Sequence, residues 1–477
     1  MKKSLSQAVA VATLLSAAAV TQAAPAIEPG GMGSALLYPV FTVDNNNSTL
    51  VSVTNTTDEY KAVKVRFLEG MNSAEVLDFH LYLSPQDVWS GSIVATANGA
   101  KLMSNDTSCI VGLSNGFPAA GLEFRTTEIK KDADLKVLAD GSANPAYVTP
   151  EKRTRVGHLE VIEMGVVDPA TVLDGTVTAG VAIKHVNGKP GNCAAVTAAW
   201  NAGGVWHTEL TSATVNKILS TPNDPIAPTS AVSGVTVPTG GLYGTAAVVN
   251  VVDSTAATYD ATAMSGLYTA AEHPYPGTIF PHLLTGVDPL IGTVAAGVPY
   301  NAAAAGNLVT AALVKTELSN DYYVDPALAA QTDFVITFPT KRFHVNGTGA
   351  PTLPFANAWN KTSHNSCDAV EVTYYDKEEA FDSVELEHIS PLPDNVTTNA
   401  LCYETNIYGM NDSDIYGGSN VRTKFQLADG FNEGWMSIKL GTAGLPVVGY
   451  TTITTKNGVS AEGVVKNFGQ TFAHKYQ

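Results

Sequence analysis

Short runs in which hydrophobic and polar residues alternate constrain this chain more than any other feature of its sequence. Val63, Val65 and Phe67 alternate with Lys64 and Arg66. A period of two is the repeat of a β-strand, whose successive side chains point to opposite faces of a sheet. We therefore expect strands with one face toward a core and the other toward solvent. The same period recurs in two C-terminal runs, residues 370–374 and 436–440.

Clusters of Asn, Asp, Gly and Pro separate many such runs, for example at Asp44–Asn47 and Asn411–Gly418. Many short strands joined by turns are typical of antiparallel sandwiches. The prediction is an all-β fold of one or more antiparallel β-sandwiches. Residues 122–129 and 334–345 are among the predicted strands, whereas residues 307–316 fit either a helix or a strand.

Composition divides the chain into parts. Residues 201–326 are rich in Ala, Gly and Thr and poor in charge, which predicts a long insertion or a second lobe. Residues 24–200 should form an N-terminal β-sandwich. Residues 327–477 form a strand-rich region that should add strands to that sandwich or build a second one.

The first residues have the pattern of a secretory signal peptide. Lys2 and Lys3 precede an apolar run from Ala8 to Val20, and small residues follow up to Ala24. Such a run is too short and wrongly flanked for a membrane anchor. We expect residues 1–23 to be removed and the protein to be exported to the cell surface or the medium, with the periplasm as the alternative.

The chain is acidic, with 27 Lys and Arg against 44 Asp and Glu and a formal net charge of −17. Loss of Lys2 and Lys3 with the signal peptide leaves 25 against 44, or −19. A surface of this sign repels nucleic acid and anionic membranes. After Val20 no stretch approaches the roughly 18 apolar residues of a membrane helix. Nucleic-acid partners and a transmembrane helix are therefore not expected.

Four cysteines, an even number in an exported chain, indicate two disulfides. Three pairings are possible. We favour Cys109–Cys193 and Cys367–Cys402, because each pair then lies within one half of the chain.

One short motif resembles the nucleophile elbow of hydrolases. Gly112-Leu113-Ser114-Asn115-Gly116 matches G-x-S-x-G, but that motif requires a helix after the serine and a parallel sheet beneath it. A second strand follows here instead. The motif is therefore interpreted as a turn, no catalytic residue is assigned, and the chain is not expected to be an enzyme.

Acidic loops are the candidate metal sites. Asp412-Ser413-Asp414 begins like an EF-hand loop, but Thr423 stands where such a loop requires a glutamate. A looser Ca²⁺ site at Asp412 and Asp414 is the remaining hypothesis, against an ordinary Asx turn.

Two tryptophans flank a glycine-rich loop in the middle of the chain. Trp200 and Trp206 enclose Asn201-Ala202-Gly203-Gly204. Exposed aromatic rings in such a loop can stack on sugars, which makes these two residues the candidate ligand contacts. Core packing is the alternative role.

Three stretches carry a resemblance to known proteins. They are Leu37–Val43, the segment from Val65 to Trp89 that contains Val-Arg-Phe-Leu-Glu-Gly-Met-Asn-Ser and Leu-Ser-Pro-Gln-Asp-Val-Trp, and Thr332–Phe343. Together they resemble a group of exported cell-surface or hypothetical proteins of Gram-negative bacteria. The resemblance implies a location and a β-rich fold, and it supplies no catalytic residues.

These observations favour a structural or adhesive protein of the bacterial surface that associates with itself, with other surface proteins or with glycans. A carbohydrate- or small-ligand-binding module is the first alternative. A secreted hydrolase is the second.

Overall fold

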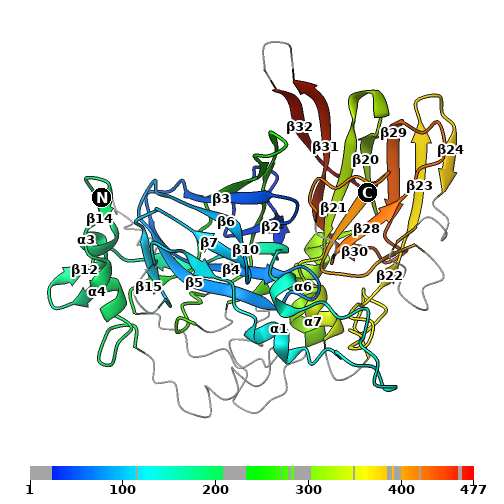
Figure 1. Cartoon of the computed structure of the whole chain (residues 1–477). Coiled ribbons are helices and arrows are strands. Elements are labelled where there is room, and N and C mark those ends of the chain that lie inside the picture. Colours follow the sequence, from blue (N-terminus) through cyan, green and yellow to red (C-terminus); the bar gives the residue numbers. More distant parts are fainter. Residues whose placement is uncertain are drawn as a thin grey trace, which may run out of the picture.

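The computed structural model describes residues 24–113, 117–207, 233–268, 270–277, 281–283, 302–346, 350–383, 389–390, 399–417, 420–459 and 465–477. Antiparallel strands dominate this part of the chain, and its helices are short (Figure 1). The predicted all-β class is confirmed. The predicted signal peptide, residues 1–23, lies outside the described residues.

Two sheets form the N-terminal half. In sheet A the strand order is β1 (Ala26–Ile27), β18 (Thr262–Ser265), β2 (Ala35–Thr42), β10 (Val156–Val167), β4 (Tyr60–Glu69), β5 (Glu75–Leu83) and β8 (Cys109–Val111), with β15 (Val235–Thr236) beside β10. In sheet B the order is β17 (Thr255–Asp260), β16 (Leu242–Asn250), β3 (Asn47–Asn55), β6 (Val88–Thr96), β7 (Gly99–Met103) and β9 (Leu122–Glu123).

Sheets A and B contribute side chains to one hydrophobic core. Val51 and Val53 of β3 point into it from sheet B, and Phe41 and Phe67 point into it from sheet A. Phe41 and Phe67 meet edge to face, with ring centroids 6.2 Å apart. Along β3 buried residues alternate with more exposed ones, as expected for a strand with one face toward solvent.

Sheet A departs from the predicted alternation, because its second face is also covered. Lys64 and Arg66, which we expected to point to solvent, are buried together with Val63 and Val65. Helix α6 (Ala302–Leu313) packs Val309 and Leu313 on this face, together with residues that follow β18. A strand buried on both faces must therefore neutralise its charged residues with buried partners.

Two further sheets form the C-terminal half. In sheet C the order is β24 (Phe381–Ser383), β23 (Glu371–Asp376), β29 (Glu433–Lys439), β20 (Glu317–Tyr323) and β33 (Lys475–Tyr476). In sheet D it is β25 (Ile389–Ser390), β28 (Arg422–Phe425), β27 (Thr405–Met410), β21 (Gln331–Thr337), β31 (Val448–Val459) and β32 (Val465–Ala473).

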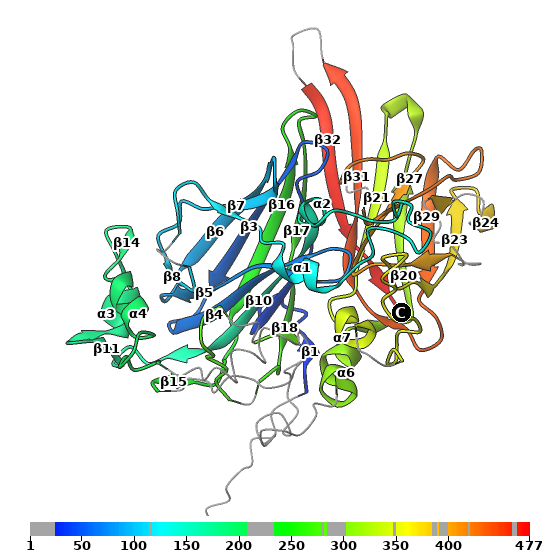
Figure 2. The same cartoon turned by 60° about the horizontal axis from the view of Figure 1, so that its bottom comes forward.

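Sheet D joins the two halves, because both of its faces are buried. Phe334 and Ile336 of β21 pack with sheet C in a second core. Their neighbour Val335, with Ile407 and Tyr450, belongs to the core of sheets A and B. Strands β31 and β32 stand between the halves in both ribbon views (Figures 1 and 2). The period of two thus places alternate residues of β21 in different cores.

The predicted division of the chain needs correction. Residues 201–326 were expected to form an insertion or second lobe, but β15, β16, β17 and β18 lie within sheets A and B, and β20 lies within sheet C. Strand β16 fits into sheet B through nine paired residues of β3. The described part of this region therefore completes the sheets that flank it.

Several local predictions also differ from the structure. Only Leu122–Glu123 of residues 122–129 is a strand, and α1 (Thr127–Lys131) follows it. In residues 334–345 the strand ends at Thr337, and α7 (Lys341–Val345) begins after Pro339. Residues 307–316, which fitted either state, fall largely in α6. The other helices in the described part of the chain are α2 (Pro150–Arg153), α3 (Ala179–Ile183), α4 (Cys193–Ala198) and the 3₁₀ turn η2 (Pro326–Leu328).

The favoured disulfide pairing is confirmed. Cys109–Cys193 ties the edge strand β8 to helix α4. Cys367–Cys402 closes a loop of sequence separation 35. It flanks the short ladder of β22 (Asp368–Ala369) and β26 (Ala400–Leu401). The remaining short strands are β11 (Val172–Asp174), β12 (Val177–Thr178), β13 (His185–Val186), β14 (Lys189–Pro190), β19 (Val314–Lys315) and β30 (Leu445–Pro446).

Candidate functional site

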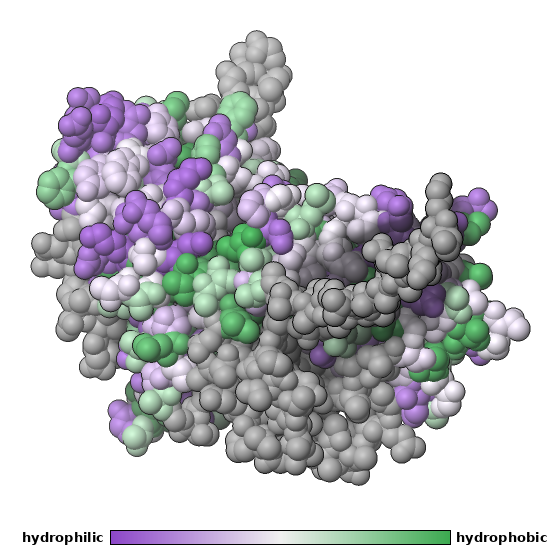
Figure 3. Space-filling view, turned by 180° about the vertical axis from the view of Figure 1, so that it is seen from behind, coloured by the Kyte–Doolittle hydropathy of each residue, from purple (hydrophilic) through white to green (hydrophobic). Residues whose placement is uncertain are grey.

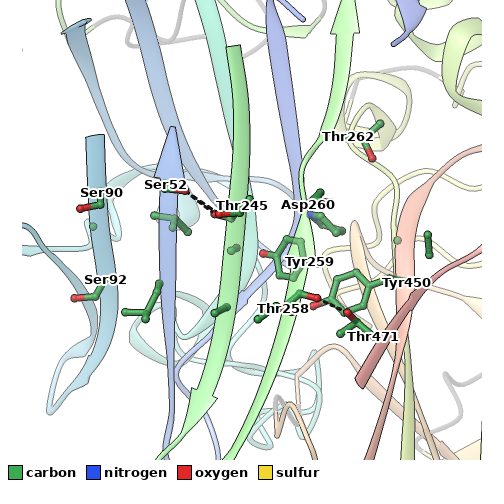
Figure 4. A pocket seen from close by; sticks show the side chains of 18 of the residues that line it. Ser52, Ser90, Ser92, Thr245, Thr258, Tyr259, Asp260, Thr262, Tyr450 and Thr471 are labelled. Carbon is green, nitrogen blue, oxygen red and sulfur yellow. Dashed lines mark hydrogen bonds between the residues drawn. The ribbon is translucent and has the colours of Figure 1, made fainter. Parts of the chain in front are cut away.

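A broad groove lies on the outer face of sheet B, against strands β31 and β32 (Figure 4). It encloses about 1160 Å³. Most of its side chains are small and bear hydroxyl groups. Those with hydroxyls are Ser52, Ser90, Ser92, Ser104, Thr245, Thr258, Thr262, Thr471, Tyr259, Tyr450 and Tyr476.

The floor of the groove follows from strand alternation. Because Val51 and Val53 face the core, Ser52 between them must point outward. The register then aligns Ser52 with Ser90 on one side and with Thr245 on the other, and Thr245 with Asp260. Ser52 Oγ and Thr245 Oγ1 are 2.9 Å apart. The result is a row of three hydroxyls across adjacent strands that ends at a carboxylate.

A second row runs beside the first and is partly apolar. Leu50 lies opposite Ser92 and Ala247, and Ala247 lies opposite Thr258. Leu50 is 46 % exposed, which is unusual for leucine in a strand and places a methyl-rich surface between the hydroxyls. The floor therefore offers hydrogen-bonding groups and apolar contact side by side.

One wall is formed where β32 meets the edge of sheet B. The Thr471 hydroxyl donates to the carbonyl oxygen of Thr258, as the dashed line in Figure 4 shows. Nearby, Lys456 Nζ lies 2.7 Å from a carboxylate oxygen of Asp253. A Cβ at Gly469 would come within 2.2 Å of the Ala256 carbonyl oxygen, so only glycine permits this approach. The wall is thus fixed by contacts between residues distant in sequence.

A stacked pair of tyrosines lies where the floor meets this wall. The Tyr259 and Tyr450 rings have centroids 4.6 Å apart and an interplanar angle of 24°. The Tyr416 hydroxyl lies 3.0 Å from that of Tyr450. Burial raises the pKa of Tyr259 and of Tyr450 well above the usual value for a phenol. Both rings therefore remain neutral at physiological pH and serve as rigid packing surfaces.

The charge of the groove is low and of one sign. Among its described lining residues Asp106 and Asp260 are the only charged ones, and no Lys, Arg or His is present. The Asp106 carboxylate accepts a hydrogen bond from the backbone N–H of Ser108, which fixes the rim loop. The arrangement can bind a polar, uncharged molecule.

Of the two roles considered for Trp200 and Trp206, ligand contact and core packing, the structure shows core packing. Both indoles are buried on the outer side of sheet A. Trp200 Nε1 donates to the Tyr82 hydroxyl at 3.0 Å, and Trp206 stacks on the Tyr82 ring with centroids 5.5 Å apart. His273 fills the remaining space against both indoles. The loop folds inward because its aromatic rings complete a third hydrophobic cluster.

Asp412 and Asp414 do not converge on a common point. Asp412 is exposed and pairs with Lys424 at 3.3 Å. Asp414 accepts a hydrogen bond from Gln331 Nε2 at 3.0 Å. Across the residues that the structure describes, no group of three or more His, Cys, Asp or Glu side chains could hold a metal ion. The Ca²⁺ hypothesis thus gains no third carboxylate at this loop.

The elbow-like motif is only partly visible. Gly112 and Leu113 follow strand β8, while Ser114–Gly116 lie outside the described residues. The chain beyond them leads to Leu122–Glu123, the edge strand of sheet B, and not to a helix. The described surroundings are those of a connection between two antiparallel sheets.

Sequence reasoning missed the groove for a physical reason. Ser52, Ser90 and Thr245 resemble ordinary solvent-facing strand positions. Only the long-range contact of β32 with β17 turns that open face into a hollow. The available signal was weak, namely serines and threonines without charged residues at the outward positions of three strands.

Comparison with protein-family models, curated proteins and solved structures gave no match for this chain. The resemblance to exported Gram-negative surface proteins therefore remains a prediction. No helix in the described part of the chain is long and apolar enough to cross a membrane. The two disulfides are compatible with export to an oxidising compartment.

Proposed function

We propose that this protein is an exported binding protein of the bacterial surface that holds a neutral, hydroxyl-rich ligand of the carbohydrate class in the sheet B groove. The single observation that carries the proposal is the groove itself, with one row of hydroxyl side chains, a second row that is partly apolar, and no cationic residue among those described. An adhesive role follows if the ligand belongs to a neighbouring surface.

The chemistry of the lining favours sugars over other ligand classes. Hydroxyl groups both donate and accept hydrogen bonds, and they match the hydroxyls of an uncharged sugar. Anionic ligands would meet Asp106 and Asp260 without a compensating cation. Typical pockets for drug-sized ligands are mostly apolar and measure about 300–1,000 Å³, so this larger, more polar groove suits part of a chain molecule.

The spacing of the rows supports an extended ligand. Adjacent strands lie about 4.8 Å apart, so Ser90, Ser52 and Thr245 present hydroxyls at regular intervals across the sheet. Leu50, which is 46 % exposed, provides apolar surface for the less polar faces of sugar rings. A polymer lying across the strands would contact several of these groups at once.

The test is a glycan array probed with the wild-type protein and two variants. Ser52→Arg places a long cation in the middle of the floor, whereas Thr373→Arg makes the same change on sheet C, far from the groove. We expect binding to neutral oligosaccharides that Ser52→Arg abolishes and Thr373→Arg preserves. Binding that is restricted to anionic glycans, or that survives Ser52→Arg, would contradict the proposal.

Self-association is a second candidate function, and an exposed aromatic row on sheet C favours it. Phe381 is 70 % exposed and Trp435 is 40 % exposed. Tyr375 lies between them and stacks on Trp435 with centroids 4.4 Å apart. Hydrophilic residues otherwise gather over this C-terminal half on the face shown in Figure 3. Sedimentation velocity over a concentration series, with Phe381→Ser as the variant, tests whether this row joins two copies.

A further inference from the structure

A buried lysine next to a buried aspartate forms an unusual cluster beside the second disulfide. Lys341, the first residue of α7, is 1 % exposed, and Asp368 is 4 % exposed. Lys341 Nζ lies 3.0 Å from Asp368 Oδ2. The amine also donates to the carbonyl oxygens of Ser366 and Leu401, which hold it in one position.

The surroundings of the amine are apolar on two sides. Its Nζ lies 5.5 Å from the centre of the Phe338 ring and 5.3 Å from that of Phe355. Burying a lysine–carboxylate pair in such a place costs desolvation free energy, and the mutual attraction often fails to offset it. An ion pair alone is therefore a poor reason for this site to exist.

The Asp368 carboxyl is held in a fixed orientation. Its Oδ1 accepts a hydrogen bond from the backbone N–H of Ala356 at 2.8 Å, which leaves Oδ2 facing the amine. Asp368 follows Cys367 directly and pairs with Leu401 across the β22–β26 ladder, next to Cys402. The disulfide and the ladder thus keep the carboxyl within reach of the lysine.

A second carboxyl completes the cluster. Glu404 is 1 % exposed, and neither of its oxygens makes a hydrogen bond of normal geometry, although Ser73 and Arg342 lie close. Burial raises the pKa of Glu404 well above its usual value, against the opposing charge of Lys341. Its backbone carbonyl accepts the N–H of Phe338 at 2.7 Å, so it lies on the chain segment beside the lysine. A buried carboxyl group whose oxygens make no hydrogen bond of normal geometry requires an explanation.

We propose that Lys341 and Asp368 condense into an intramolecular amide, with Glu404 as the acid–base group. The ammonium of Lys341 first transfers a proton to the Asp368 carboxylate across their contact. The neutral amine then attacks Cγ of Asp368, so that a C–N bond forms. Glu404 takes the remaining amine proton and delivers a proton to the departing hydroxyl, the C–O bond breaks, and one water leaves.

This condensation needs no oxidant, reductant or cofactor. Two charged groups become one neutral amide and one water, so the burial of charge is removed and not merely compensated. Proximity in a rigid site makes such a step effectively unimolecular. Within the C-terminal half, the product would add a covalent link between α7 and the β22–β26 ladder, beside the Cys367–Cys402 bridge.

Other buried lysines provide a comparison. Lys61 contacts Glu163 at 2.9 Å, but the Glu163 carboxylate also accepts hydrogen bonds from the backbone N–H groups of Thr239 and Gly240. The second carboxylate beside Lys61, that of Glu59 at 2.8 Å, is 41 % exposed and also accepts a hydrogen bond from the Thr239 hydroxyl, so this pair lacks a buried carboxylic acid like Glu404. Lys61→Arg is therefore a matched control for Lys341→Arg.

The test is the mass of the purified full-length protein after disulfide reduction, followed by tryptic mapping. We expect the wild type to be lighter by one water, with cleavage after Lys341 lost and a branched peptide that joins the segments containing Lys341 and Asp368. Glu404→Gln and Lys341→Arg should restore the full mass, and Lys61→Arg should keep the loss. A wild type of full mass that yields two separate peptides would overturn the proposal whether or not any variant folds.

Discussion

Replacement of Arg153 by methionine should test how strongly buried charge holds the two halves together. Arg153 is buried, and its guanidinium makes two contacts with Glu69, at 2.6 and 3.0 Å. The same group reaches Asp132 at 2.9 Å and Asp134 at 2.8 Å. It also lies 5.8 Å from the Trp359 ring of the C-terminal half. Arg153→Met keeps the volume and removes the charge.

The expected loss of stability is large because Glu69 and Asp134 lose their cation, and Asp132 keeps only the longer contact with Arg342, at 3.5 Å. Removing one partner of a buried ion pair costs about 3–5 kcal/mol, whereas exchanging the whole pair for apolar residues can be neutral. We expect a loss in this range at pH 7. The exposed Arg125 is the control, and Arg125→Met should change stability by less than about 0.5 kcal/mol.

The loss should depend on pH in a defined direction. Burial alone would raise the pKa of Glu69, but Arg153 and the backbone N–H groups of Met71 and Asn72 outweigh it and hold that pKa below its usual value. A carboxyl with a lowered pKa in the folded state stabilises the protein above its ordinary pKa, and this contribution is lost as the pH falls through the folded value. The difference in the free energy of unfolding between wild type and Arg153→Met should therefore become smaller as the pH falls.

Urea unfolding followed by tryptophan fluorescence, at pH 7 and near pH 4, measures both effects. The reasoning would be refuted by a loss below about 1 kcal/mol at pH 7, the range of an exposed pair. If the difference in the free energy of unfolding stays constant with pH, the attribution of its pH dependence to Glu69 is refuted.

Three other outcomes are expected. Trp206→Ala should cost about 3–5 kcal/mol in chemical denaturation by leaving a cavity, while glycan binding stays intact; lost binding in a folded variant would reinstate this residue as a ligand contact. The double variant Cys109→Ser, Cys193→Ser should lose about 2–5 kcal/mol, and an unchanged melting temperature would show that this bridge is dispensable. Burial lowers the pKa of His80 well below its usual value, and neither ring nitrogen has a hydrogen-bond partner among the described residues. A histidine whose pKa is lowered in the folded state makes the folded protein less stable as the pH falls below about 6.5, because the unfolded state then binds the proton more tightly. His80→Leu should therefore weaken the fall of unfolding free energy with decreasing pH, and an unchanged pH dependence would contradict this.

The sequence predicted those features that depend on neighbours along the chain. The alternating runs at residues 63–67, 370–374 and 436–440 fall, to within one residue, in the strands Tyr60–Glu69, Glu371–Asp376 and Glu433–Lys439. The disulfide pairing followed from the position of the cysteines in the two halves. Export and the surface role remain predictions.

What the sequence could not show depends on contacts between distant segments. Lys64 and Arg66 look like solvent-facing positions, and they are buried only because α6 and the chain after β18 cover sheet A. Trp200 sits in a loop that looks exposed, and it turns inward toward Tyr82. The groove exists only because β32 lies against β17. Local patterns carry no information about such covering elements.

The most direct test of the proposed function is a calorimetric titration of a neutral oligosaccharide, selected on the array, into the wild type, Ser52→Arg and Thr373→Arg. We expect a Kd that is insensitive to salt, because the ligand carries no charge, at least tenfold weaker binding for Ser52→Arg, and unchanged binding for Thr373→Arg. Equal affinity for wild type and Ser52→Arg would place any glycan site elsewhere on the molecule and would contradict the assignment of the groove.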